Sequence, residues 1–206
     1  MHSLPDDNKI HLWRTQFPVT TSQPVREQKK SWQKLTHDWI DDILISQYGL
    51  SKEEAHIDYH DSGKPYLSNL ADKVNISISH SFELASFAIS SIPEMGIDLE
   101  KKIPKKNLNM LWEKLNRFEE SLTAERFYAV WTQLEAYTKA QGSSIVESQY
   151  ITEKLLSLPK EKLIHGVFNE KSWYFYTDEN DNSTLSIALH SNAPVEVNCL
   201  SESINA

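Results

Sequence analysis

Two stretches of this 206-residue chain, one in each half, carry the apolar spacing of a long amphipathic helix. In residues 27–48, apolar side chains recur every three or four positions, and Gly49 follows where a helix commonly ends. The spacing over residues 123–141 predicts the second helix, with Thr123 as its N-cap and Gly142 as its stop. Each helix must bury its apolar stripe against other elements of the chain.

Short β-type runs accompany both helices. Some alternate apolar and polar residues, as in VNISISH, and others flank a turn signal such as Ser62-Gly63-Lys64-Pro65. The runs lie at 10–15, 74–80, 82–90, 95–100, 163–168, 172–177 and 184–190. The pattern predicts an α+β fold, a pseudo-dimer of two similar α+β halves, each a long helix packed on a small antiparallel sheet. We place the boundary just after Pro93, which gives halves 1–95 and 96–206, and assign no strand to the tail after Asn192.

Composition narrows the class of protein. Hydrophobic residues make up 39% of the chain and charged residues 24%, as in ordinary globular proteins. The net charge of −8 argues against general binding to nucleic acid. We expect no signal peptide, because the N-terminal residues lack an apolar run, and no segment has the roughly 20 apolar residues that span a bilayer. A single cysteine, Cys199, also suits the cytoplasmic location that we predict.

Residues 95–100 (MGIDLE) form an acidic β-type run. Side chains alternate between the two faces of a strand, so Asp98 and Glu100 share one face while Ile97 and Leu99 share the other. Carboxylates one strand repeat apart are separated by roughly 7 Å at the backbone, which lets them share a hard cation. The alternative is an edge strand with a solvated polar face.

Three further groups of residues could carry chemistry. Glu135 could add a carboxylate to the first two, or could form an ordinary i, i+4 ion pair with Lys139. Gly63-Lys64-Pro65 could bring backbone and a cation to a nucleotide, or could be a simple turn. Ser79-His80 ends a strand with a hydroxyl and an imidazole, although such a histidine often bonds only to a carbonyl. None of these patterns identifies a function alone.

The order and spacing of four motifs give a stronger signal. GKPYL (63–67), NISISHS (75–81), GIDLE (96–100) and WTQLEAYTKAQG (131–142) follow one another along the chain. This series resembles the motifs of the two-domain, surfactin-synthetase-type 4′-phosphopantetheinyl transferases. The resemblance extends less specifically to the opening strand and the first long helix.

The resemblance implies a transferase that uses Mg²⁺, with Mn²⁺ as an alternative ion, and coenzyme A as co-substrate. Such an enzyme moves the phosphopantetheine arm onto a serine of an apo acyl or peptidyl carrier protein and releases 3′,5′-ADP. The implied metal ligands are Asp98, Glu100 and Glu135. The implied catalytic residues are Glu135, Lys139 near the transferring phosphate, and an acid at Glu119 or Glu120. The implied coenzyme-binding residues are Gly63, Lys64, Pro65, Ser79 and His80, with Lys30, Lys34 or Arg26 replacing an arginine usual on the first long helix.

Two departures from the family pattern matter. Leu134 stands where a lysine is usual, which removes one cation that could face the phosphates, and Ser143-Ser144 follows Gly142 where many relatives repeat a glycine. Leu134 keeps open a second hypothesis, a non-catalytic module of the same fold that binds carrier proteins or coenzyme A. A third hypothesis, a metal-dependent phosphohydrolase, would need additional acids or histidines.

The partner prediction follows from charge. Carrier proteins commonly present an acidic helix, and this chain is itself acidic, so docking needs a local basic or apolar patch. The candidates are residues 101–106 and residues 110–122. We expect a monomer that binds neither nucleic acid nor membrane.

Overall fold

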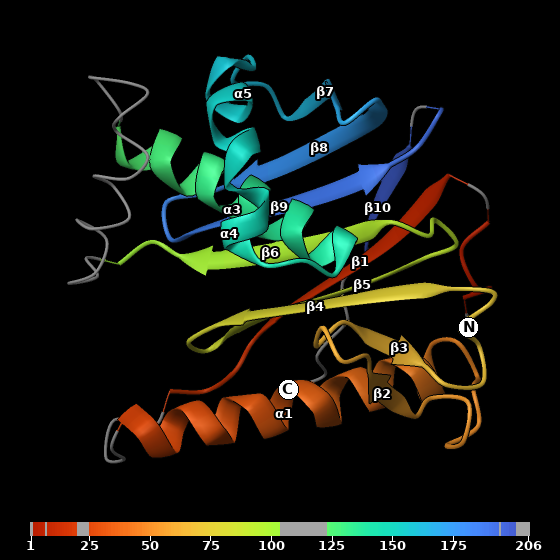
Figure 1. Ribbon diagram of the computed structural model, residues 1–206. Helices are drawn as coiled ribbons and strands as arrows, with labels where there is room; N and C mark the ends of the chain where they lie inside the picture. The colour runs from red at the N-terminus through yellow and green to blue at the C-terminus, as the bar shows by residue number, and fades with distance from the viewer. Residues whose placement is uncertain (1, 7, 20–24, 104–122, 194, 201–206) are drawn as a thin grey trace.

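The computed structural model describes residues 2–6, 8–19, 25–103, 123–193 and 195–200. It is an α+β fold in which two four-stranded sheets lie between two long helices (Figure 1). The elements are β1 (Lys9–Gln16), α1 (Val25–Ser46), β2 (Ile57–Tyr59), β3 (Pro65–Leu67), β4 (Asn75–Ser81), β5 (Leu84–Ser90), β6 (Met95–Lys101), α3 (Ala124–Gln141), α4 (Ile145–Ser148), the 3-10 turn η1 (Gln149–Ile151), α5 (Thr152–Ser157), β7 (Leu163–Phe168), β8 (Lys171–Glu179), β9 (Ser183–His190) and β10 (Glu196–Leu200).

The first sheet has the strand order β10-β1-β5-β4 and the second the order β6-β9-β8-β7. All pairs are antiparallel except β1 and β10, which run parallel. The prediction that the tail after Asn192 contains no strand is therefore wrong, because β10 lies there. The β10 strand is short and only partly buried, and its partner β1 lies at the other end of the chain, so local sequence gives little sign of it.

The core has three parts. The α1 helix packs on the first sheet, where Trp39, Ile40 and Ile43 join the buried side chains of β4 and β5. The α3 helix packs on the second sheet around Tyr137 and Trp173. A third apolar cluster fills the space between the two sheets, with members from β1, β5, β6 and β9. Because Ile97 and Leu99 belong to this inner cluster, the alternate side chains of β6 must face the α3 side.

The ends of α3 are capped as the sequence predicts. Thr123 accepts a hydrogen bond on its hydroxyl from the backbone N–H of Arg126, at 3.2 Å. Gly142 adopts the left-handed conformation with φ of 63°, and its N–H donates to the carbonyl of Lys139. Glycine adopts this conformation without the steric penalty of other residues, which explains the stop. Within the described residues, no helix has both the length and the hydropathy to cross a membrane.

Candidate active site

The acidic pair lies where the two sheets meet. Asp98 and Glu100 are on β6, the edge strand of the second sheet, beside β4, the edge strand of the first. The Ser79 hydroxyl donates to Asp98 Oδ1 at 3.0 Å, and the Ser81 hydroxyl donates to Glu100 Oε2 at 2.7 Å. Asp98 is only 5% exposed. The alternative of a solvated polar face therefore does not describe Asp98.

A close contact at Gly96 brings α3 to this strand. A Cβ added at Gly96 would lie 2.2 Å from the carbonyl oxygen of Ala136 and 2.5 Å from the backbone nitrogen of Ala140. Only a residue without a side chain permits this approach. The ammonium of Lys139 lies 2.7 Å from Asp98 Oδ1 and 3.1 Å from the Ser79 hydroxyl. Gly96 is thus a packing residue, and the close approach that it permits brings Lys139 of α3 within reach of Asp98.

Glu135 lies one helical turn before Lys139 and is half-buried. The α3 helix runs antiparallel to β6, since Gly96 lies against Ala136 and Ala140 while Ile103, beyond the strand, bonds to Tyr128. This direction places the helix position of Glu135 along the strand's second half. Among the described residues, however, no three Asp, Glu, His or Cys side chains are grouped so as to hold a metal ion. The three predicted ligands are therefore not grouped as a complete metal site.

The donor atoms at Asp98 and Glu100 nevertheless fit a hard cation. Asp98 Oδ2 is buried and has no hydrogen-bond partner within the described part of the chain, whereas Oδ1 receives both Ser79 and Lys139. A buried carboxylate oxygen without a partner is unfavourable unless a donor or a cation meets it. Mg²⁺ is commonly bound by one or two carboxylates, with waters and phosphate oxygens completing its shell. The two strand carboxylates suit that preference.

The Gly63-Lys64-Pro65 turn meets the C-terminal end of α3. Gly63 has a φ of 82°, as the tight turn requires, and Lys64 donates through its ammonium to the carbonyl of Ala140 at 2.9 Å. Burial lowers the pKa of Lys64, which Glu94 partly offsets. A pocket of about 120 Å³ lies between this turn, β4 and the end of α3, and Lys139 and Gly142 line it. The structure thus brings this turn, β4 and the C-terminal end of α3 together around one pocket.

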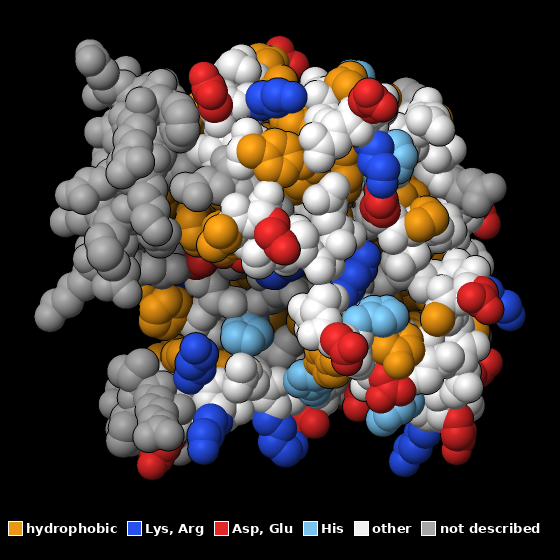
Figure 2. Space-filling view, in the orientation of Figure 1, with side chains coloured by type: hydrophobic (Ala, Val, Ile, Leu, Met, Phe, Trp, Pro, Cys, Tyr) orange, Lys and Arg blue, Asp and Glu red, His pale blue; other side chains and the backbone are white. Residues whose placement is uncertain are grey.

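His80 lies at this junction in a positive environment. Burial is the main cause of a lowered pKa for His80, followed by the positive charges of Lys139 and Lys29 and by His37, while the negative charge of Asp98 acts in the opposite direction. Figure 2 shows histidine and lysine side chains across the face between α4 and α1. An anion bound here would be favoured by these charges. Lys29 belongs, with Arg26, Lys30 and Lys34, to a basic cluster that the sequence indicates as a place for an anion, and it is the α1 lysine whose charge lowers the pKa of His80.

The lowered pKa of His80 predicts a pH dependence of stability. The unfolded chain titrates near the ordinary value of 6.5, whereas the folded protein takes up this proton only at lower pH. The unfolded state therefore binds more protons below pH 6.5, and stability falls as the pH drops towards the folded pKa. Urea unfolding between pH 7 and pH 5 should show this fall, and the variant His80→Gln should show a smaller one. His11, whose pKa is also lowered mainly by burial, leaves a residual slope in both. Identical pH profiles for the two proteins would contradict the assignment.

The other residues predicted for the site lie away from this junction or outside the residues that the structure describes. Lys30 is exposed, and Lys34 forms an exposed ion pair with Asp38 at 2.6 Å on α1. The ammonium groups of Lys101 and Lys102 pair with Glu83 and Glu179. Glu119, Glu120 and the docking segment 110–122 lie outside the described residues, as do residues 104–106; nothing is described of the Arg26 side chain either. These assignments stay predictions.

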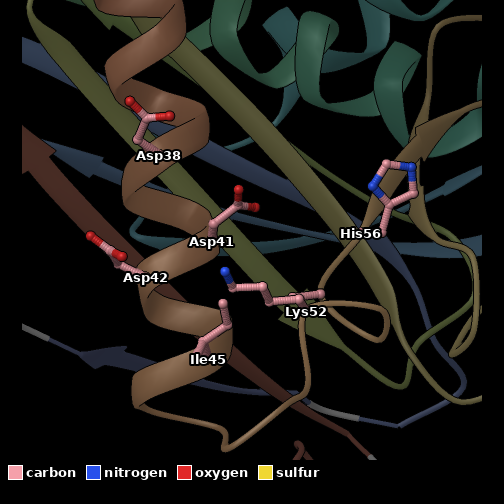
Figure 3. Close-up of a pocket in the computed structure, with 7 residues that line it drawn as sticks. Asp38, Asp41, Asp42, Ile45, Lys52 and His56 are labelled. Carbon is pink, nitrogen blue, oxygen red and sulfur yellow. The ribbon is translucent and has the colours of Figure 1, made fainter.

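A wider pocket, of about 450 Å³, lies between the second half of α1 and the loop that follows it, and none of the junction residues lines it (Figure 3). Its lining includes Asp38, Asp41 and Asp42 of the helix, and Lys52 extends towards them from the following loop. Three carboxylates around one ammonium make a poor site for a pyrophosphate. The greater volume of this pocket therefore does not make it the better candidate for a pyrophosphate site.

Comparison with known proteins agrees with the motif series. The chain is 30% identical, over 132 residues, to the 4′-phosphopantetheinyl transferase HetI of Nostoc sp.. The aligned part covers 59% of this chain and 56% of HetI, so the chain spans about half the length of the curated relative it matches. No protein-family model matches the chain. The similarity supports phosphopantetheinyl transfer in general as the class of activity to test.

Proposed function

We propose that the chain is a Mg²⁺-dependent 4′-phosphopantetheinyl transferase of the two-domain, surfactin-synthetase type. It would transfer the arm of coenzyme A to a serine of an acyl or peptidyl carrier protein and release 3′,5′-ADP. The observation that carries the proposal is the meeting of a buried carboxylate, Asp98, with Lys139 and the Gly63-Lys64-Pro65 turn at one junction. The similarity to HetI supports the same reaction class.

The proposed reaction exchanges one P–O bond for another. The carrier serine oxygen bonds to the phosphorus that bears the arm, the bond from that phosphorus to the bridging pyrophosphate oxygen breaks, and 3′,5′-ADP leaves. The serine proton passes to a base, for which Glu119 and Glu120 are candidates. Asp98 and Glu100, with Glu135 as the third predicted ligand, would hold Mg²⁺, which neutralises pyrophosphate charge when bound. Lys139 adds a fixed positive charge beside it, and charge neutralisation with positioning is what such a transfer chiefly needs.

The Leu134 departure does not favour the non-catalytic alternative. Leu134 is 1% exposed and belongs to the buried cluster of Tyr137 and Trp173 on the far side of α3 from Lys139. Position 134 is a core position in this chain, so a leucine there does not remove a positive charge from the junction. Leu134 therefore no longer argues for the binding-module hypothesis.

The remaining parts of the proposal concern organisation. We propose that the two layers of helix and sheet are related as a pseudo-dimer with its boundary at residues 95 and 96, β10 crossing back to the first sheet. The protein would act as a cytoplasmic monomer. Gly63, Lys64, Pro65, Ser79 and His80 would lie at the coenzyme end of the junction, and Lys29 joins them as a candidate because it acts on His80.

The test is transfer to a panel of apo-carrier proteins from fatty-acid, polyketide and peptide synthesis. The full chain is incubated with coenzyme A and Mg²⁺, and each carrier is weighed intact by mass spectrometry. We expect at least one carrier to gain a phosphopantetheine arm, and its serine-to-alanine variant to gain none. EDTA should prevent the gain. Coenzyme A binding without any modified carrier across the panel would contradict the proposal and favour the binding module.

A further inference from the structure

Hydroxyl groups, rather than backbone carbonyls, join the free edges of the two sheets. The backbone N–H of Ile97 donates to the Ser77 hydroxyl at 3.0 Å, that of Leu99 to Ser79 at 3.0 Å, and that of Lys101 to Ser81 at 3.1 Å. Each step advances two residues on both strands, so β4 and β6 run parallel with a constant register. We call these three side chains, Ser77, Ser79 and Ser81, the serine ladder.

The Ser79 hydroxyl has no bonding capacity left for a ligand. A hydroxyl has one donor and two acceptor lone pairs. Ser79 donates to Asp98 Oδ1 and accepts from the backbone of Leu99 and from Lys139. It is only 4% exposed. A contact with coenzyme A would have to break one of these three bonds.

Ser81 makes the equivalent pair of bonds one step along. It accepts from the Lys101 backbone and donates to Glu100 Oε2, and it is 7% exposed. Ser77 differs from these two residues. It accepts from the Ile97 backbone, but among the described hydrogen bonds it donates to no carboxylate. The ladder therefore contains two members that touch the acidic pair and one that does not.

We propose that Ser79 and Ser81 are positioning residues for the metal-binding carboxylates. By donating to Asp98 Oδ1, together with Lys139, Ser79 leaves the buried Oδ2 as the oxygen presented to a cation. Ser81 fixes the rotamer of Glu100 in the same way. The inference rests on the proposed function for the metal, and it adds that the first sheet, through β4, sets the geometry of carboxylates carried by the second.

The consequence is that metal binding depends on the register between the two sheets. Groups that orient a metal ligand through hydrogen bonds typically contribute 10–100-fold to metal affinity. Without its hydroxyl partner, each carboxylate loses one of the contacts that fix its orientation and can rotate away from the shared cation. The loss should appear in metal binding itself, before any transfer takes place.

The experiment measures Mn²⁺ binding to the full chain from the loss of the free-ion EPR signal, with no coenzyme or carrier present. Ser79→Ala and Ser81→Ala should each weaken Mn²⁺ affinity by roughly 10-fold or more. Ser81→Thr, which keeps the hydroxyl, should restore it. Ser77→Ala is the matched control. It removes the same kind of bond to β6 but no bond to a carboxylate, so affinity should stay within about 2-fold, since it lacks the orienting role.

Thermal unfolding separates positioning from stability. All three alanine variants leave one N–H of β6 without its partner, so each should lower Tm by several degrees, and Ser79→Ala, which loses the most bonds, should lower it most. Equal Mn²⁺ affinities for Ser77→Ala, Ser79→Ala and Ser81→Ala would overturn the positioning role while leaving the transferase proposal standing. Failure of the unmodified protein to bind Mn²⁺ would overturn both the metal site and the positioning role.

Discussion

Replacing Asp98 by asparagine is expected to lower arm transfer at least about 100-fold while the protein remains folded, since metal charge stabilisation is worth several kcal/mol. The amide keeps the shape of the carboxyl and can still accept from Ser79 through its oxygen. It removes the negative charge that faces Lys139 and that would hold the cation. The fold should survive because the Lys139 side chain is 33% exposed and can turn to solvent.

Asp178→Asn is the matched control for this variant. Asp178 is likewise paired with cations, Arg14 at 2.7 Å and Lys162 at 3.3 Å, but its side chain is more exposed than that of Asp98 and it lies on β8, away from the junction. Transfer rates should therefore be unchanged in this variant when circular dichroism shows both proteins folded. If Asp98→Asn and Asp178→Asn retained the same activity, Asp98 would not be part of the site.

Replacing Gly96 by alanine is expected to give the largest loss of stability at the junction. The added Cβ would meet backbone atoms of α3 at 2.2 and 2.5 Å, and backbone atoms cannot rotate away as a side chain can. The helix must shift outwards, which we expect to lower the free energy of unfolding by about 3 kcal/mol, the upper part of the range for overpacking. Urea unfolding measures this loss directly.

Gly166→Ala provides the comparison within the same sheet. Its Cβ would meet the Phe168 ring at 2.6 Å, which is a side chain and can adjust, so the loss of stability should be smaller. The Gly96→Ala variant should also lose transfer activity beyond its loss of folded protein, because Lys139 moves with the helix. Equal stability losses in the two variants would mean that the contact between β6 and α3 is not tight in solution.

Local patterns predicted most of the framework. The apolar spacing of the two long helices, the caps at Thr123 and Gly142, and the alternation of residues 95–100 depend only on neighbours in sequence, and the structure has them. The order of the four motifs assigned residues of the turn at 63–65, β4, β6 and α3 to one candidate site. These are the parts of the fold and candidate site that short-range physical rules can reach.

The parts that the sequence did not reveal depend on distant contacts. The role of Gly96 appears only when Ala136 and Ala140 of α3, distant in the sequence, pack against it. The serine ladder needs the register between two sheets, although hydroxyls at alternate positions 77, 79 and 81 were a signal that could have raised the question. The β10 strand needs its partner from the start of the chain.

The most direct measurement of the central claim is the stoichiometry of the reaction. With coenzyme A, Mg²⁺ and an accepted apo-carrier, 3′,5′-ADP and holo-carrier are quantified in the same samples over time. The proposed transfer predicts one 3′,5′-ADP released for each carrier that gains an arm, and neither product when the carrier serine is replaced by alanine. Release of 3′,5′-ADP without modified carrier would indicate hydrolysis, and would contradict the assignment of this junction as a phosphopantetheinyl transferase site.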